Sequence, residues 1–197
     1  MINVRTSAMI KSDKPRRRTV KRNRSIVATL IAALGAAFSV SQGAEINVPS
    51  DFPATQPAIN AAGDGDTIIV SPGRYVENID FLRKAITVRS TDPLNEQVVE
   101  STIIDGGGSR SCVRFVNKET SDSVISGFTI INGYAGGVSF RDNSGGGVFC
   151  SYSSPTISYN IIKFNVAEHS GGGICCRDGA AVILSNQIIG NTAFYGG

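Results

Sequence analysis

Residues 145–150 read Gly-Gly-Gly-Val-Phe-Cys, and residues 171–176 read Gly-Gly-Gly-Ile-Cys-Cys, so the same short pattern returns after 26 residues. The match continues downstream at the same offset, with apolar and Asn residues in equivalent places. The equivalent pairs are Ile157 and Ile183, Asn160 and Asn186, Ile162 and Ile188, and Asn165 and Asn191. A further copy begins at Gly196-Gly197, one residue early. An internal period in the twenties is typical of a solenoid, in which each repeat packs on the next.

The residues within each copy favour β-strands over helices. The apolar stretches are short, rich in Val, Ile and Thr, and bounded by Gly, Asn, Ser or Pro. Alternate residues such as Val148 and Cys150, or Ile174 and Cys176, share one face of a strand. Leu is too scarce for a leucine-rich repeat. The pattern predicts an all-β fold, a parallel β-helix, and an earlier degenerate copy runs through residues 125–133.

Stacked copies bring equivalent residues together, because neighbouring strands lie about 4.8 Å apart. We therefore expect ladders of amide hydrogen bonds at the bends, with Asn160 over Asn186 and Asn165 over Asn191. Asn tolerates the left-handed backbone, so these residues are expected to adopt it. The Gly triplets are expected at a turn that needs positive φ. The expected inward stacks are Val148 over Ile174, Ile157 over Ile183, and Ile162 over Ile188.

The cysteines lack the spacing of zinc ligands, since no Cys-x-x-Cys motif occurs and the only His is His169. Cys150 over Cys176 is predicted to join the inward stack, whereas Phe149 over Cys175 is predicted to point outward. Residues one coil apart are at disulfide distance in principle, but buried free thiols that fill apolar space are the favoured interpretation. No metal site is assigned to the four cysteines, which are Cys112, Cys150, Cys175 and Cys176.

The first 44 residues have the composition of a signal peptide. A basic segment precedes the apolar run from Ile26 to Val40, and cleavage is expected after Gly43 or Ala44. The apolar run is too short for a bilayer core, which needs about 20 residues. An uncleaved N-terminal anchor is the alternative. Export predicts a secreted, cell-surface or periplasmic location for residues 45–197, with no transmembrane span after signal removal.

The net charge of +3 over the 197 residues comes from the predicted signal peptide, residues 1–44. Residues 1–44 hold nine Lys/Arg and one acidic residue, which leaves ten Lys/Arg against fifteen Asp/Glu in residues 45–197, a net charge of −5. A domain this acidic, without a stripe of Lys and Arg, is unsuited to nucleic-acid binding. The apolar share of 41% is enough for a packed core.

The segment before the repeats predicts a helix that caps the N-terminal end of the solenoid. Residues 55–62 form a short amphipathic pattern, with Ile59 and Ala62 facing the first coil. Further strands are expected at residues 67–70, 85–88, 98–104 and 112–116. A new coil opens at Gly196-Gly197 without a C-terminal cap. The domain is therefore expected to be truncated there, and its uncapped end to favour aggregation or end-to-end pairing.

Several motifs between Ile46 and Val88 carry a family resemblance. They are Asp51-Phe52-Pro53, Ala58-Ile59-Asn60-Ala61-Ala62, Asp64-Gly65-Asp66-Thr67 and Pro72-Gly73-x-Tyr75-x-Glu77-Asn78. This stretch resembles the N-terminal cap and first coils of secreted pectin-lyase-like right-handed β-helix proteins. The pattern Asn165-x-Ala167 followed by Gly171-Gly172-Gly173-Ile174 is similar to the repeats of polymorphic outer-membrane proteins, which are surface adhesins. The resemblance implies a right-handed parallel β-helix outside the cytoplasm but not one activity, because the superfamily includes lyases, hydrolases, esterases and adhesins.

Two acidic residues 26 apart, Asp142 and Glu168, each precede a Gly triplet by three residues and are expected to stack one coil apart. Asn143 and His169 accompany them. Close carboxylates repel each other unless a cation or a shared proton relieves the repulsion. The four residues form a candidate cation or carbohydrate site, with calcium as the suitable cation and no other cofactor expected. The alternative is that both acids are solvated loop charges.

The sequence favours an exported scaffold without its own catalysis, for surface structure, adhesion, or binding of an extracellular polysaccharide or a surface protein. The alternative is an enzyme of the pectate lyase or polygalacturonase type, with Arg114, Arg141 and Arg177 as candidate bases or carbohydrate clamps. No catalytic residue is assigned, because no motif of such enzymes is found. A metal-maturation accessory protein is disfavoured by one His and two Met. Asp105 and Asp178 are interpreted as turn residues.

Overall fold

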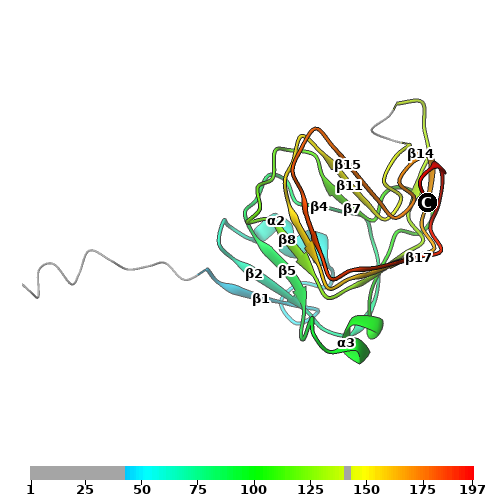
Figure 1. The fold of residues 1–197 in the computed structure, drawn as a ribbon. Helices are drawn as coiled ribbons and strands as arrows, with labels where there is room; N and C mark the ends of the chain where they lie inside the picture. The colour runs from blue at the N-terminus through cyan, green and yellow to red at the C-terminus, as the bar shows by residue number, and fades with distance from the viewer. Residues whose placement is uncertain (1–42, 140–142) are drawn as a thin grey trace, which may run out of the picture. The chain divides into compact units, whose positions relative to one another are not determined.

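The computed structural model of the chain describes residues 43–139 and 143–197. These residues form eighteen short strands and two short helices, α2 (Thr55–Ala61) and α3 (Glu96–Ser101). All strand pairs are parallel, and the strands form four sheets, named A to D below (Figure 1). The predicted signal peptide lies almost wholly outside the described residues. Within the described ranges, no helix has the length and apolar content needed to cross a membrane.

The strands of each sheet come from well-separated parts of the chain. Sheet A contains β1 (Glu45–Val48), β2 (Thr67–Val70), β5 (Thr87–Ser90), β8 (Val124–Ser126), β12 (Thr156–Ser158) and β16 (Val182–Leu184). Sheet B contains β3 (Gly73–Val76), β6 (Thr102–Asp105), β9 (Thr129–Ile131), β13 (Ile161–Lys163) and β17 (Gln187–Ile189). Sheet C contains β4 (Ile79–Asp80), β7 (Val113–Phe115), β11 (Val148–Ser151) and β15 (Ile174–Arg177). Sheet D contains β10 (Tyr134–Ala135), β14 (Val166–Ser170) and β18 (Thr192–Tyr195).

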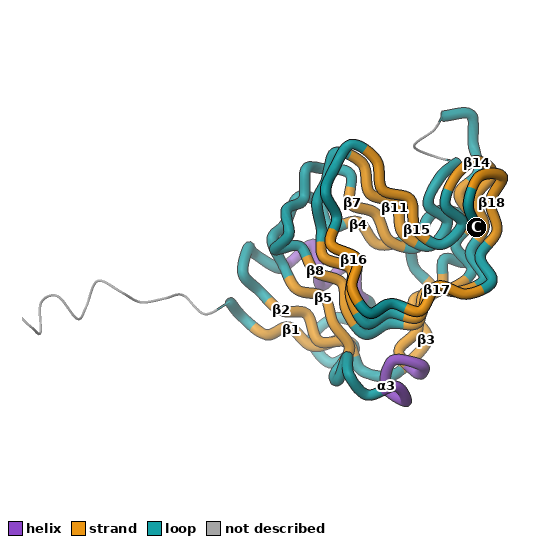
Figure 2. Tube along the Cα trace, in the orientation of Figure 1, coloured by secondary structure: helices purple, strands orange, loops and turns teal. Residues whose placement is uncertain are grey.

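The chain visits the sheets in a fixed order. From β11 to β18 it passes through sheets C, A, B and D and then repeats the same order. A set of successive strands, one from each sheet, is termed a layer below, and Figure 2 shows equivalent strands of successive layers side by side. The predicted inward stacks are confirmed, because the three pairs are in register. These pairs are Val148 with Ile174, Ile157 with Ile183, and Ile162 with Ile188.

The space between the sheets is filled by one apolar core. Its fully buried members include residues of sheets A and B, among them Ile68, Val88, Ile104, Ile125, Ile130, Ile157 and Ile162. Ile125 pairs with Ile157 and Ile130 with Ile162, which confirms the degenerate copy at residues 125–133. Each fully buried aliphatic side chain stabilises the fold by about 1.5–3 kcal/mol through removal of apolar surface from water.

From β11 onward, the residue directly after each strand turns the chain with a left-handed backbone. From β11 to β18 these residues have φ between 52° and 67°, and they are Tyr152, Tyr159, Phe164, Gly171, Asp178, Ser185, Gly190 and Gly196. The prediction that the ladder Asn residues adopt this conformation is therefore wrong. Tyr159 turns the chain before Asn160, and Phe164 does so before Asn165. Both Asn side chains are buried, and the more exposed residue before each of them adopts the left-handed conformation instead.

The Asn side chains connect successive layers at two corners. Asn165 Oδ1 accepts the N–H of Gly133 at 2.8 Å, and Asn165 Nδ2 donates to Asn191 Oδ1 at 3.0 Å. Asn160 Nδ2 donates to Asn186 Oδ1 at the same distance, 3.0 Å. Asn160 and Asn165 are at most 1% exposed, so their amides satisfy buried backbone groups that water does not reach.

The Gly triplets combine a left-handed turn with a close approach of two layers. The positive φ predicted for the triplets occurs at their first glycine only, since Gly145 has φ of 70° and Gly171 has φ of 60°. The next residue has a different reason to be glycine, because a Cβ atom on Gly172 would collide with the carbonyl oxygen of Thr192 in the following layer. No larger residue fits at this corner without displacing the neighbouring strand.

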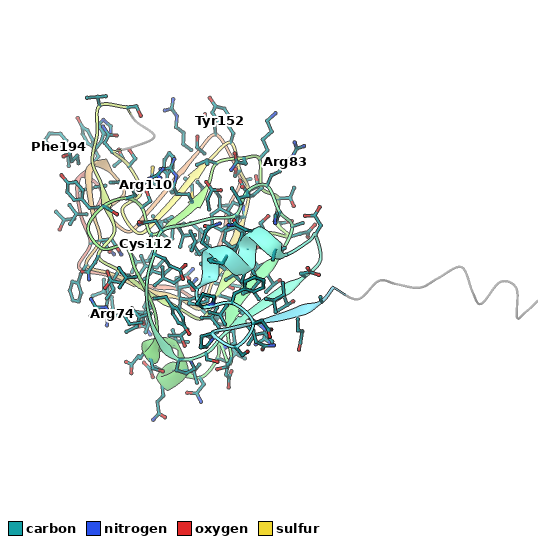
Figure 3. All side chains as sticks on the ribbon, turned by 180° about the vertical axis from the view of Figure 1, so that it is seen from behind. Arg74, Arg83, Arg110, Cys112, Tyr152 and Phe194 are labelled. Carbon is teal, nitrogen blue, oxygen red and sulfur yellow. The ribbon has the colours of Figure 1, made fainter. Side chains whose placement is uncertain are left out.

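Helix α2 covers the N-terminal end of the core, close to the predicted range of residues 55–62 (Figure 3). Ala58 and Ile59 are fully buried, and Ala62 is 4% exposed. These side chains belong to the same apolar cluster as the first strands of sheets A and C. The helix therefore completes the core at this end.

Two charged side chains from the connections after β3 and β4 hold the ends of α2. The Glu77 carboxylate accepts hydrogen bonds from the first turn, and the Lys84 ammonium donates to carbonyls of the last turn. The partners of Glu77 are the N–H groups of Thr55 and Gln56, both at 3.0 Å, and those of Lys84 are the carbonyls of Ile59, Asn60 and Ala62, at 2.6–2.8 Å. These contacts satisfy backbone groups that a helix leaves unpaired, and their signs match the helix dipole.

The prediction of a strand over residues 98–104 is wrong in its first half, because α3 occupies that part and β6 begins only at Thr102. Asn95 starts α3, since its Oδ1 accepts the N–H groups of Gln97 and Val98. The other predicted strands are present: residues 67–70 are β2, residues 112–116 contain β7, and the strand predicted at 85–88 begins two residues later as β5.

All four cysteines are free thiols, and their exposure increases toward the last strands. Cys112 and Cys150 are buried, Cys175 is half-buried and Cys176 is exposed. Cys150 pairs in register with Cys176, as predicted. Burial raises the pKa of the Cys112 thiol to about 12, so this side chain stays neutral and serves as a small apolar filler.

The prediction that Phe149 points outward needs a correction, because its side chain is fully buried. Phe149 does not belong to the main core cluster but is covered on the other face of β11. The guanidinium carbon of Arg114 lies 5.7 Å from the ring centroid, and the turn at Gly145 packs against the Phe149 backbone. The strand pattern predicts only which face carries the side chain, whereas the covering residues come from other segments.

Replacing Lys84 by Met is expected to lower the free energy of unfolding by about 1.5–3 kcal/mol, because it removes charge-assisted hydrogen bonds to the end of α2. Urea titration followed by circular dichroism measures this change. The matched control is Lys163→Met on β13, which should change stability by no more than about 0.5 kcal/mol. Equal effects of the two substitutions would contradict the capping role of Lys84.

Replacing Asn165 by Ala is expected to lower the free energy of unfolding by about 2–4 kcal/mol, because buried backbone groups lose their partners. Asn191 occupies the equivalent position in the last layer and is only half-buried, so water can replace its hydrogen bonds. Asn191→Ala should therefore cost at least about 1 kcal/mol less in the same urea titration. A larger loss for Asn191→Ala would show that the ladder is not stabilised in this way.

Candidate functional site

A groove of about 530 Å³ runs along the corner between sheets B and D. Its lining residues are Arg74, Val76, Asp105, Gly107, Gly108, Asn132, Gly133, Tyr134, Phe164 and Val166. They come from β3, from the end of β6, from the corners after β6, β9 and β13, and from the first residues of β10 and β14, so the groove crosses four successive layers. Layers about 4.8 Å apart give it a length of about 14 Å along the stack. In Figure 3, Arg74 lies at the outer margin of the strands, whereas Cys112 lies inside them.

Arg74 and Asp105 form an ion pair in this groove. The guanidinium binds Asp105 Oδ2 through Nε at 2.6 Å and also through Nη2. The Asp105 side chain is 3% exposed and the Arg74 side chain is 59% exposed. The buried carboxylate thus fixes the guanidinium, whose other N–H donors remain for a molecule bound in the groove.

Hydrogen bonding and charge set the ionisation state of Asp105. Burial raises its pKa, but hydrogen bonds from Gly107, Arg74 and Asn132, together with the charge of Arg74, outweigh burial and bring the pKa below its usual value. Gly107 donates its N–H to Oδ1 at 3.0 Å. The carboxylate is therefore ionised at neutral pH with both oxygens engaged, which suits a residue that positions Arg74.

Exposed apolar side chains form much of the remaining lining. Val76 is 70% exposed, Phe164 is 61% exposed, and Tyr134 and Val166 are 38% exposed each. Phe164 has φ of 57°, which is uncommon for a bulky side chain and costs about 1–3 kcal/mol. This strained position presents an aromatic ring to the groove, where a flat apolar face can stack on a ligand ring.

Tyr134 connects the groove to Glu168, a member of the predicted cation site. Its hydroxyl donates to Glu168 Oε1 at 2.6 Å, and the N–H of Gly137 donates to Oε2 at 3.1 Å. The hydrogen bond to Glu168 raises the pKa of Tyr134, and the hydrogen bonds from Tyr134 and Gly137 lower the pKa of Glu168. At neutral pH the pair is a neutral phenol bound to a carboxylate.

The other residues of the predicted cation site have different surroundings. Asp142 lies outside the described residues. The carbonyl of Asn143 accepts the N–H of His169 at 2.8 Å, and His169 Nδ1 lies 2.7 Å from the hydroxyl of Ser170. No group of three or more His, Cys, Asp or Glu side chains that could hold a metal ion occurs among residues 43–139 and 143–197. Calcium binding stays a prediction that depends on Asp142.

The arginines named as candidate bases or clamps do not line the groove where they are described. Arg114 lies over Phe149, and Arg177 Nε forms an ion pair with Asp178 at 3.0 Å. Arg141 lies outside the described residues. The arginine of the groove is Arg74, which the sequence did not single out.

The sequence contains a signal for part of the groove and none for the rest. Asn132 and Phe164 both occupy the left-handed position before a corner residue, so alignment on the Asn165 ladder could have placed them together. Arg74 has no such signal, because its partner Asp105 lies 31 residues away, outside the 26-residue period. The position of Arg74 beside Asp105 can be inferred only once β3 is paired with β6.

Comparison of the chain with models of known protein families, with curated proteins and with solved structures found no match. No family membership is therefore assigned. The chemistry of the groove is the basis on which a function can be proposed.

Replacing Asp105 by Asn is expected to lower the free energy of unfolding by about 1–3 kcal/mol near neutral pH, because the charged partner of Arg74 is lost. The pKa of Asp105 is lowered in the folded state, so its stabilising contribution exists above the unfolded pKa of about 3.9 and disappears as the pH falls through the folded value. The difference between wild type and variant should thus shrink below about pH 4 in urea titrations.

The exposed carboxylate of Asp122 provides the matched control for this pH series. Asp122→Asn should leave stability within about 0.5 kcal/mol of wild type from pH 3 to pH 7. A difference between wild type and Asp105→Asn that stays constant down to pH 2.5 would contradict the ion pair as its cause.

Proposed function

We propose that this protein is an exported right-handed parallel β-helix that binds an acidic extracellular polysaccharide in the groove between sheets B and D, without its own catalysis. One observation carries the proposal. A guanidinium fixed by a buried carboxylate shares a groove with an exposed aromatic ring held in a strained conformation. These are the residues Arg74, Asp105 and Phe164.

The topology supports the β-helix part of the proposal. The chain passes through sheets C, A, B and D twice in the same order, and all neighbouring strands are parallel. A chain that advances by one strand in every sheet per circuit winds as a helix of strands. Connections between parallel strands of one sheet are right-handed in almost all proteins, which favours the right-handed form. The resemblance of the N-terminal motifs to pectin-lyase-like proteins agrees with this winding.

The chemistry of the groove supports an acidic polysaccharide as ligand. The guanidinium of Arg74 is planar and matches the two oxygens of a carboxylate, such as that of a uronic acid. Phe164 and Tyr134 provide flat apolar faces beside it. The groove runs across the layers, so an extended sugar chain would contact several of them in succession. Export, which the first 44 residues predict, would place the protein where such polymers occur.

The surroundings of the two carboxylates near the groove, those of Asp105 and Glu168, favour binding over catalysis. Asp105 and Glu168 each accept hydrogen bonds on both oxygens. Asp105 is also 3% exposed and ion-paired with Arg74, so its carboxylate is covered rather than offered to a substrate or cation, and Glu168 holds the Tyr134 hydroxyl. The alternative, an enzyme of the pectate lyase or polygalacturonase type, is therefore an outcome to be tested rather than the main proposal.

Isothermal titration with oligogalacturonides and with neutral gluco-oligosaccharides of equal length tests the proposal. The acidic series should bind more tightly. Arg74→Met should weaken binding of the acidic series at least about tenfold, whereas Phe164→Ala should weaken binding of both series. Tyr152→Ala removes an equally exposed aromatic ring outside the groove and should leave binding unchanged.

Two further arms of this experiment separate the alternatives. Titration with added calcium and with a chelator shows whether a cation contributes to binding. Absorbance of unsaturated products on polygalacturonate, or release of reducing ends, would establish the enzyme instead. No binding of either series, or equal binding by wild type, Arg74→Met and Phe164→Ala, would refute the groove as a polysaccharide site.

A further inference from the structure

The corner between sheets C and A carries a tight turn with an unusual backbone. Residues 81–84 form this turn, which is closed by a hydrogen bond from the Lys84 N–H to the Phe81 carbonyl at 3.0 Å. Its two central residues, Leu82 and Arg83, have φ of 55° and 65°. Turns with positive φ at both central positions are dominated by Gly, Asn and Asp, because other side chains are strained there. Leu and Arg at these positions therefore hold the turn in a conformation that costs free energy.

The same corner of the next layer carries another exposed residue with a left-handed backbone. Lys118, in the connection from β7 to β8, has φ of 67°, and it is exposed, as Arg83 is. Residues of the two corners line a pocket of about 450 Å³, and none of them is acidic. These residues are Leu82, Arg83, Val116, Asn117 and Lys118. An Arg and a Lys from successive layers therefore share one pocket.

A buried carboxylate holds both strained segments in place. Glu119 is 3% exposed, its Oε1 accepts the N–H of Arg83 at 2.9 Å, and its Oε2 accepts the N–H of Asn117 at 2.8 Å. The hydroxyl of Ser153 donates to the same Oε2 at 2.7 Å and accepts the N–H of Lys118 at 3.1 Å. Charge-assisted hydrogen bonds of this kind are strong, so they fix the backbone from which the Arg83 and Lys118 side chains project.

The positive charges of Arg83 and Lys118 are not neutralised by a direct partner. Within the described residues, no acidic side chain forms an ion pair with either of them. Asp80 lies beside the turn, but its Oδ1 accepts the Leu82 N–H at 2.8 Å and the Asn117 Nδ2 at 3.0 Å. Strained backbone conformations cluster at binding sites, where the surrounding structure maintains them. The pocket thus brings two positive charges together on a domain that is acidic as a whole.

The pocket is separate from the groove that contains Arg74. The chain passes through sheets C, A, B and D in order, so the corner between C and A lies across the layer from the corner between B and D. Figure 3 shows Arg83 and Arg74 on opposite sides of the described part of the chain. No residue lines both the pocket and the groove. A ligand of the pocket is therefore additional to the polysaccharide proposed for the groove.

We propose that this pocket binds a phosphate or sulfate group between the Arg83 guanidinium and the Lys118 ammonium. Both side chains are hydrogen-bond donors that carry a fixed positive charge at neutral pH, and Arg and Lys are the side chains that recognise such groups in proteins. Two cations match the double charge of phosphate or sulfate better than the single charge of a carboxylate. The two layers are about 4.8 Å apart, so one tetrahedral group can contact both side chains.

Isothermal titration with inorganic phosphate, inorganic sulfate and acetate tests this inference at constant ionic strength. The protein carries Arg74→Met, which removes the guanidinium of the groove. Phosphate and sulfate should bind with a dissociation constant of about 1 mM, and acetate at least about tenfold more weakly. Arg83→Met and Lys118→Met should each weaken phosphate binding at least about tenfold. Arg110→Met removes an equal charge from an exposed residue outside the pocket and should leave phosphate binding unchanged.

Glucose 6-phosphate and glucose distinguish a free anion from an ester. Tighter binding of glucose 6-phosphate than of inorganic phosphate, with no binding of glucose, identifies a phosphate ester as the ligand. Equal or weaker binding of the ester identifies the free anion. In the protein that retains Arg74, Arg83→Met should bind oligogalacturonides as wild type does. Failure of the pocket and failure of the groove are therefore distinguishable.

The backbone strain provides a second readout, which separates binding from folding. Arg83→Gly and Lys118→Gly place glycine where φ is positive, so both should raise the urea midpoint of unfolding while they weaken phosphate binding. Residues that serve the fold alone would give a lower midpoint and unchanged binding, which would overturn the inference. No binding of phosphate or sulfate, or binding that neither Arg83→Met nor Lys118→Met weakens, would overturn it as well.

Discussion

Parallel pairing in register between successive layers is the constraint on which the rest of the structure depends. Because each strand pairs with its equivalent one layer on, each side chain has its own equivalent about 4.8 Å away. Apolar residues then form columns in the core, and a buried polar side chain must find its partners within its own column, as Asn165 does with Asn191. From β11 onward the corners add a second requirement, a left-handed residue after each strand, which leaves side chains such as Phe164 exposed.

The fold could be predicted from the sequence where successive layers have equal lengths. The 26-residue offset between Asn160 and Asn186 repeats over the last two layers, and it placed their strands, ladders and turns. One layer earlier the corresponding offset, from Phe128 to Asn160, is 32 residues, because the connections are longer. When two layers differ in length, the offset of 26 residues no longer identifies which residues pair. The strand predicted at 98–104 failed for this reason, since α3 occupies a connection that the short repeats do not have.

The candidate site was harder to predict, because its residues come from layers of unequal length. Arg74 and Asp105 are 31 residues apart, and Tyr134 and Glu168 are 34 apart. Neither separation matches the repeat. Glu168 was found because it precedes a Gly triplet, yet the partner that the structure describes for it is Tyr134. Periodicity identifies residues that stack on their equivalents, such as Tyr134 and Val166. The ion pair of Arg74 with Asp105 and the hydrogen bond from Tyr134 to Glu168 instead join residues that are not equivalent.

The two ends of the fold use charge in opposite ways. Asp51, Glu77 and Lys84 bind backbone groups at the N-terminal end. Residues 179–197, in the last layer, contain no Asp, Glu, Lys or Arg, and Arg177 pairs with Asp178 just before them. The groove keeps its ion pair on the lateral surface, in the layers of β3 and β6, where the buried carboxylate of Asp105 positions Arg74.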